Sequence, residues 1–145
     1  MEVGGGPIAI DGDTIAVGTP KDGGTVYIFT RTEETWHEQA KLQAINRQNH
    51  DEFGKSVAID GDTVVIGDSG DDTGCGNAGA AYIFTRTGET WRQQVKLQAS
   101  DRYPGDRFGN SVAIEGDTIV VGAHGRNKGK ASVGGAAYIL SLIHI

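Results

Sequence analysis

Short apolar runs rich in β-branched residues recur along the chain, and none of them has helical spacing. One pattern, in which an aliphatic and an acidic residue precede Gly-Asp-Thr and an aliphatic run ending in glycine, occupies residues 10–18, 59–67 and 114–122. Runs that are apolar on both faces are typical of strands covered on both sides. Asp-Gly between two such runs is a strong hairpin signal, so the pattern predicts two antiparallel strands joined by a tight turn, with Asp and Gly both at positive φ.

Two further blocks complete a repeating unit. A third strand is predicted at residues 25–29, 81–84 and 137–140, each built around Tyr-Ile. A fourth is predicted at residues 36–44 and 91–99, where tryptophan leads into Lys-Leu-Gln-Ala. The two tryptophans are 55 residues apart, which sets the length of the unit. The repeating unit is therefore about 55 residues long and contains four blocks.

The fourth strand alternates differently from the other three. Trp91, Gln93, Val95 and Leu97 fall at every second position, and the positions between them are polar. This alternation predicts one apolar face and one polar face. A polar row suits an outer edge strand, because charge there discourages pairing with another chain.

Four antiparallel strands with a polar fourth strand describe a propeller blade. We therefore expect an all-β fold, a partial β-propeller of about two and a half to three four-stranded antiparallel blades. The single domain spans residues 1–145, with repeat units at about 1–45, 46–99 and 100–145. The first unit is predicted to lack most of its opening strand and the third its fourth strand, so that only the middle unit is complete.

Propellers close with four to eight blades, which is more than this chain supplies. We expect the chain to be a fragment of a longer propeller, because its last residues depart from the repeat. The alternative is that several copies of the chain associate to complete a ring.

The starts of the units carry a family resemblance. Phe53-Gly54 and Phe108-Gly109 each precede a predicted first strand, and glycine ends each second strand. This pattern resembles the FG-GAP repeat found in integrin α-chain propellers. A kelch propeller is the rival, since Gly23-Gly24 precedes a tyrosine and later a tryptophan.

The FG-GAP resemblance implies a non-enzymatic binding or adhesion module at the cell surface or outside the cell, with a protein or carbohydrate ligand. Two alternatives stay open: a non-catalytic accessory propeller of a larger secreted hydrolase, and a purely structural scaffold. Many repeats of this family hold Ca²⁺ in an Asp-rich loop between strands one and two. Here that connection is a tight turn, which cannot wrap six to eight oxygens around the ion. No cofactor is therefore firmly expected.

The loops between strands two and three differ in length, and such variation at one end of a rigid scaffold is where binding residues are expected. In the second unit this loop carries Asp68, Asp71 and Asp72, whose carboxylates could bind a hard cation such as Ca²⁺ or a basic partner. In the third unit the loop is basic and includes His124 and Arg126. These five residues are the candidate ligand-binding site. The alternative is that the loops are merely solvated, as we also expect for Asp51 in the loop before the second unit.

The composition and the lengths of the apolar runs argue against several classes of function. The net charge of −6 argues against nucleic acid as a partner. No apolar run reaches the roughly 20 residues of a membrane span, and no signal peptide is visible. Cys75 is the single cysteine, and the four histidines are dispersed, so no catalytic residues are predicted.

Overall fold

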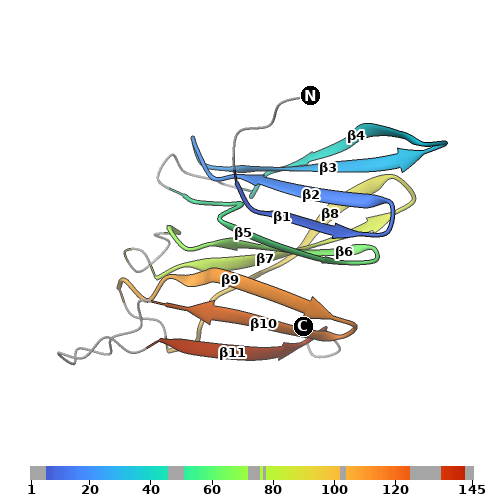
Figure 1. Cartoon of the computed structure of the whole chain (residues 1–145). Coiled ribbons are helices and arrows are strands. Elements are labelled where there is room, and N and C mark those ends of the chain that lie inside the picture. Colours follow the sequence, from blue (N-terminus) through green and yellow to red (C-terminus); the bar gives the residue numbers. More distant parts are fainter. Residues whose placement is uncertain are drawn as a thin grey trace.

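The computed structural model describes residues 6–45, 51–71, 76, 78–101, 104–124 and 135–142. In this part of the chain all regular structure is β, without an α-helix (Figure 1). The strands are β1 (Ile8–Asp11), β2 (Thr14–Thr19), β3 (Thr25–Thr32), β4 (Thr35–Leu42), β5 (Ser56–Asp60), β6 (Thr63–Asp68), β7 (Ala80–Thr87), β8 (Thr90–Leu97), β9 (Phe108–Glu115), β10 (Thr118–Ala123) and β11 (Ala136–Ser141).

Each strand pairs antiparallel with the next one along the chain, within three separate sheets. Sheet 1 contains β1 to β4, sheet 2 contains β5 to β8, and sheet 3 contains β9 to β11 among the described residues. The all-β, partial-propeller prediction is confirmed. The prediction that only the middle unit is complete was wrong, because β1 pairs with β2 along its whole length and gives sheet 1 four strands.

The turn between the first and second strands has two residues, Gly and Asp. Asp11 pairs with Thr14, so the aspartate of the Asp-Gly motif is the last strand residue and not part of the loop. Gly12 and Gly61 have φ of 56° and 58°, whereas neither following aspartate has positive φ. The expectation of positive φ at both Asp and Gly was therefore wrong. The φ signs are those of a type II′ turn, which needs glycine only at its first position.

The Asp of this motif has a second role, between sheets. The Asp11 carboxylate accepts a hydrogen bond from the Gly61 N–H at 2.6 Å, and Asp60 accepts one from the Gly116 N–H at 2.6 Å. β1 and β5 thus each end on an acceptor for the turn of the next sheet. The acidic residue recurs with the repeat because successive sheets are linked through it.

The sheets stack as three layers, in chain order (Figure 1). We call the face that carries the third-strand tyrosine (Tyr27, Tyr82 or Tyr138) the front of a sheet and the other face its back. The front of sheet 2 packs on the back of sheet 1, where Tyr82 and Phe84 meet Val26 and Ile28.

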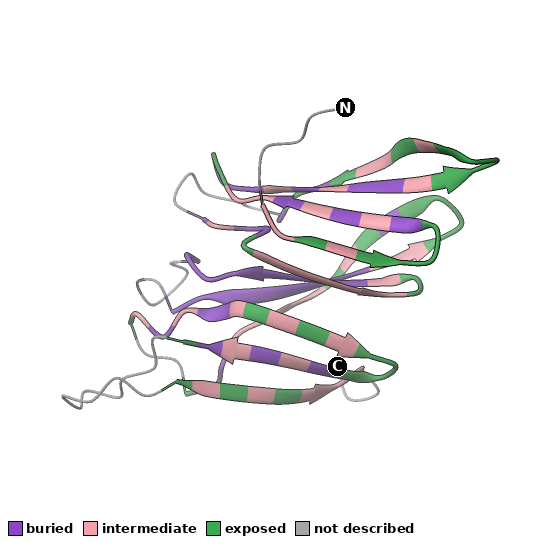
Figure 2. Ribbon diagram, viewed as in Figure 1, coloured by how far each residue is buried: buried purple, intermediate pink, exposed green. Residues whose placement is uncertain are grey.

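The front of sheet 3 packs on the back of sheet 2 in the same way, and Ile119 and Val121 meet Val65 and Ile83 there. These four side chains are buried. Sheet 2 is therefore covered on both faces, as its purple strands in Figure 2 show.

A β-bulge changes the facing of the fourth strand. Phe84 pairs with Gln93, but Ile83 pairs with Val95, so the register shifts by one residue. Trp91 therefore packs in the core between sheets 1 and 2, whereas Val95 and Leu97 pack in the core between sheets 2 and 3. The predicted single apolar face was wrong, because an inserted residue moves the later side chains to the other face.

The Phe-Gly pairs fill the space between neighbouring sheets. The Phe53 ring lies edge-on to Tyr82 at 5.2 Å, and Phe108 meets Tyr138 in the same way at 5.1 Å. A Cβ on Gly67 would overlap the carbonyl oxygen of Gly109 in the next sheet. Glycine thus occupies the next-to-last position of the second strand because the backbone of the following unit lies directly against it.

Candidate functional site

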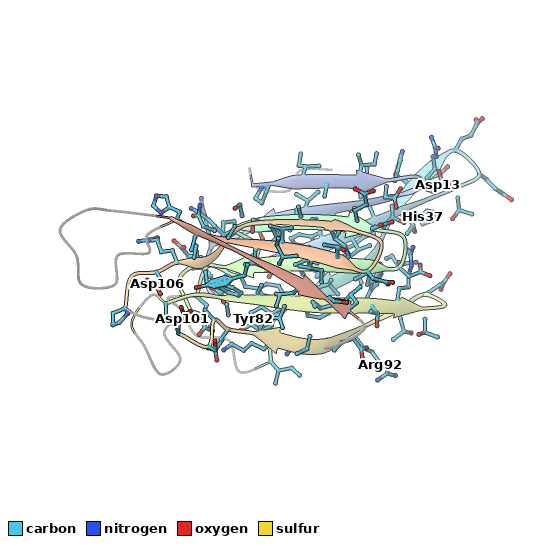
Figure 3. All side chains as sticks on the ribbon, turned by 90° about the horizontal axis from the view of Figure 1, so that it is seen from below. Asp13, His37, Tyr82, Arg92, Asp101 and Asp106 are labelled. Carbon is cyan, nitrogen blue, oxygen red and sulfur yellow. The ribbon has the colours of Figure 1, made fainter. Side chains whose placement is uncertain are left out.

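The loops between second and third strands, and those leading into first strands, lie at one end of the stack. We call this the loop end. Figure 3 labels Asp101 and Asp106 at this end and Asp13 and His37 at the opposite, turn end. Because the strands are antiparallel and sequential, every sheet has the same orientation, and the loops of all three gather at one end.

Three carboxylates meet inside the loop end of sheet 2. Asp51 precedes β5, Asp68 is the last residue of β6, and Asp71 follows three residues later in the loop to β7. One oxygen of each lies within 4.8 Å of the other two. All three residues are buried, with exposed fractions of 5%, 0% and 2%.

Asp68 is the most enclosed member of this acidic cluster. One of its oxygens accepts a hydrogen bond from the Glu52 N–H at 2.7 Å. The other, Oδ2, is buried and has no hydrogen-bond partner among the residues that the structure describes. Burial raises the pKa of Asp68 to about 7; the Glu52 hydrogen bond opposes this shift, and the charges of Asp51 and Asp71 add to it.

Asp71 is held by two donors from its own sheet. The Lys96 ammonium lies 2.7 Å from its Oδ2, and the Tyr82 hydroxyl donates to the same oxygen at 3.3 Å. Burial raises the pKa of Tyr82, and the neighbouring carboxylates raise it further, so the phenol stays a donor. Lys96 also lies over the Tyr82 ring, with its nitrogen 5.6 Å from the ring centroid.

The predicted site residues do not form one exposed rim. Asp68 and Asp71 lie together, but their burial keeps them from touching a basic partner directly. His124 is exposed and directly follows β10 at the loop end. Asp72 and Arg126 lie outside the described residues.

Asp51 was missed, because it was expected to be solvated, and the structure buries it. One signal in the sequence could have identified it. Asp51 stands two residues before Phe53, and Asp106 stands two residues before Phe108 and is also buried. An acidic residue that recurs at the same distance from a buried phenylalanine in two repeats is expected to be buried as well, whereas a solvated loop residue need not recur.

The cluster has an unbalanced charge. With all three carboxylates ionised and Lys96 protonated, its net charge is −2. Nearby Glu52 is engaged elsewhere, accepting a hydrogen bond from the Ser69 hydroxyl at 2.7 Å and lying 3.8 Å from Arg107. The arrangement can take up either protons or a cation.

The other conspicuous polar group lies toward the turn end, between sheets 1 and 2. Arg86 pairs with Asp62 at 2.9 Å and stacks on Trp91, with its guanidinium carbon 4.8 Å from the ring centroid. Gln39 of sheet 1 accepts hydrogen bonds from both Arg86 and Trp91. Trp91 is thus a packing residue between the two sheets.

Comparison with known proteins bears directly on this repeat. A family model described as FG-GAP repeat matches residues 36–84 and 91–140. Each match runs from the fourth strand of one sheet to the third strand of the next, and so spans the contact between sheets. The matches support FG-GAP rather than kelch repeats.

A search of curated proteins found no significant match. Within the described residues, no helix has the length and apolar character required to cross a membrane. The two repeat matches together cover more than half of the chain, and the chain belongs to the FG-GAP repeat family.

Proposed function

We propose that the chain is a non-enzymatic interaction module that binds a protein or carbohydrate ligand at its loop end, at the cell surface or outside the cell. Membership of the FG-GAP family supports this proposal, because its repeats are generally non-catalytic and typically extracellular. A place beside a catalytic domain in a larger secreted hydrolase is compatible with the same binding end.

One observation carries the proposal: the two ends of the stack differ in how much their connections vary. At the turn end every described connection between paired strands has two residues. At the loop end the second and third strands are joined by residues 20–24, 69–79 and 124–135. Variable loops on a constant scaffold are typical of binding surfaces.

His124 offers a test with a matched control. It is exposed at the loop end, directly after β10. His37 is exposed at the turn end (Figure 3). Binding of the chain would be measured on an array of immobilised oligosaccharides and on a set of extracellular glycoproteins. For a bound probe, we expect His124→Ala to weaken affinity about tenfold, a change of about 1.4 kcal/mol, and His37→Ala to leave it unchanged.

Two outcomes would contradict the proposal. One is that neither probe set binds the wild-type chain. The other is that a probe does bind and the two histidine substitutions have equal effects, since binding would then not be located at the loop end.

A further inference from the structure

We propose that Asp51, Asp68 and Asp71 bind one Ca²⁺ ion in the interior of the loop end of sheet 2. The ion would join the segment before β5 to the loop after β6. This role is internal to the scaffold and goes beyond ligand binding at the surface.

The spacing of the oxygens suits this ion. Two oxygens bound to one Ca²⁺ at 2.3–2.6 Å lie at most about 5 Å apart, whereas Mg²⁺ gives up its waters reluctantly and is seldom held by protein ligands alone. One oxygen of each carboxylate lies within 4.8 Å of the other two. This upper limit is compatible with Ca²⁺, and carboxylates are the hard oxygen ligands that it prefers.

A second observation, independent of the clustering, points to a missing ligand. Oδ2 of Asp68 is buried without a hydrogen-bond partner among the described residues, although Asp68 is 0% exposed. An unsatisfied buried carboxylate oxygen is costly, and buried charges are normally paired or bound to metals. A cation between the three carboxylates satisfies this oxygen.

The charge balance also favours a divalent ion. Lys96 neutralises one of the three carboxylates through Asp71 and leaves a net charge of −2. One Ca²⁺ cancels that charge, and the Lys96 and Tyr82 contacts to Asp71 both involve its Oδ2.

The site is separate from the turns between first and second strands. Those turns have two residues and lie at the turn end, whereas Asp68 ends β6 at the loop end. Among the described residues, the cluster of three carboxylates also occurs in sheet 2 alone. At the corresponding end of β10 in sheet 3, Ala123 follows Gly122 as Asp68 follows Gly67, although buried Asp106 corresponds to Asp51.

The test compares the full chain, stripped of metal with EDTA, before and after addition of Ca²⁺ or Mg²⁺. Isothermal titration calorimetry gives the stoichiometry and affinity, and thermal unfolding gives the shift in Tm. We expect one Ca²⁺ per chain, a Tm raised by several degrees, and weaker binding of Mg²⁺. Asp68→Asn should weaken Ca²⁺ binding at least tenfold, and Asp106→Asn, the matched control, should leave it unchanged.

Several results would overturn the proposal: no heat and no Tm shift with Ca²⁺, Mg²⁺ binding as tight as Ca²⁺, or Ca²⁺ binding retained in Asp68→Asn. Circular dichroism would establish that Asp68→Asn is folded. If it is not, Asp51→Asn replaces it with the same expected loss. Because calorimetry with metal alone needs no partner, failure here leaves the proposed ligand binding at His124 untouched.

Discussion

Asp68 is the residue whose surroundings differ most from those of an ordinary aspartate. Its carboxyl is enclosed at the end of β6, beside two other carboxylates and one ammonium group. Without a cation, protonation of the Asp68 carboxyl removes its unfavourable buried negative charge. Burial accordingly raises the pKa of Asp68 from its ordinary value of 3.8 to about 7 in the folded chain.

This shift predicts how the stability of the metal-free chain depends on pH. A carboxyl whose folded pKa is raised contributes stability below its unfolded pKa and loses it as pH rises through the folded pKa. The loss should therefore occur between about pH 4 and pH 7 and amount to at most about 4 kcal/mol. Asp68→Asn should remove this component, so that the variant is relatively more stable at pH 8 than at pH 4. Urea unfolding in EDTA measures the free energy of unfolding at each pH. Parallel pH profiles for the wild type and Asp68→Asn would contradict the prediction.

Two adjacent residues with a Cβ have positive φ in the turn between β3 and β4. Glu33 and Glu34 have φ of 51° and 69°, a region that costs a residue with a Cβ about 1–2 kcal/mol. In the equivalent turn of sheet 2, Gly88 occupies the first position at 64°, and Glu89 does not have positive φ.

Glu33→Gly should therefore raise the free energy of unfolding by about 0.5–1 kcal/mol, since glycine adopts this φ without strain. Glu89→Gly is the matched control, and it should be neutral or destabilising because no strain is relieved there. Chemical denaturation of both variants gives the answer, and a destabilised Glu33→Gly would show that the strain is absent.

At the scale of elements, the bulge in β4 brings sheet 1 into contact with sheet 2. The register shifts between Ile28 and Phe29, and Gln39 is the residue inserted opposite them. Its Oε1 lies 2.8 Å from Nε1 of Trp91 and 3.1 Å from the Arg86 guanidinium. A single amide oxygen thus receives two donors from the neighbouring sheet.

Gln39→Ala should cost about 1–3 kcal/mol, because the Trp91 and Arg86 donors lose an acceptor in a largely buried place. Gln94 occupies the equivalent bulge position in β8 and is exposed, so Gln94→Ala should be nearly neutral. Thermal unfolding of the two variants measures the difference. Equal losses of stability would mean that the hydrogen bonds of Gln39 to the neighbouring sheet contribute no stability.

Much at the scale of elements could be predicted from sequence, for identifiable reasons. The aliphatic runs around residues 59–67 are covered on both sides, and local composition already indicates this. The bulge could not be predicted, because Gln93-Gln94 looks like any alternating polar pair and only the pairing register reveals the insertion. The Asp11 bond to the next turn was likewise hidden, since it joins residues 50 positions apart.

The acidic site was predicted in part. Asp68 and Asp71 lie in one short acidic loop, so proximity in sequence identified them. Asp51 is 17 residues before Asp68 and reaches it because β5 and β6 form a hairpin that returns the chain to the same end. Their burial follows from stacking of sheets, which no local pattern encodes.

At the scale of the whole molecule, the two outer faces of the stack differ from the inner ones. Ile8 and Ile10 on the front of sheet 1 are 70% and 63% exposed, and Ile139 on the back of sheet 3 is 77% exposed. On the front of sheet 1, Arg31 stacks on Trp36 and pairs with Asp13, as Arg86 does with Trp91 and Asp62 one sheet later. The front of sheet 1 therefore carries the same Arg, Trp and Asp arrangement as the front of sheet 2, which another sheet covers.

We propose that isolated chains associate by stacking the front of sheet 1 on the back of sheet 3 of another copy. Such a contact uses two different surfaces and adds subunits head to tail. Sedimentation velocity should show association that increases with concentration. Ile139→Glu should abolish it, and Ile45→Glu, at an isoleucine of similar exposure (68%) beyond the end of β4, should not. A wild-type chain that stays monomeric at all concentrations would contradict this.

If an ion inside sheet 2 organises the loop end, a crystal structure of the chain grown with Ca²⁺ should show it. We expect an anomalous difference peak between Asp51, Asp68 and Asp71, with an oxygen of each at 2.3–2.6 Å. Absence of a peak, with the Asp68 carboxyl instead donating a proton to a neighbouring acceptor, would show that the cluster is neutralised by protonation and holds no metal.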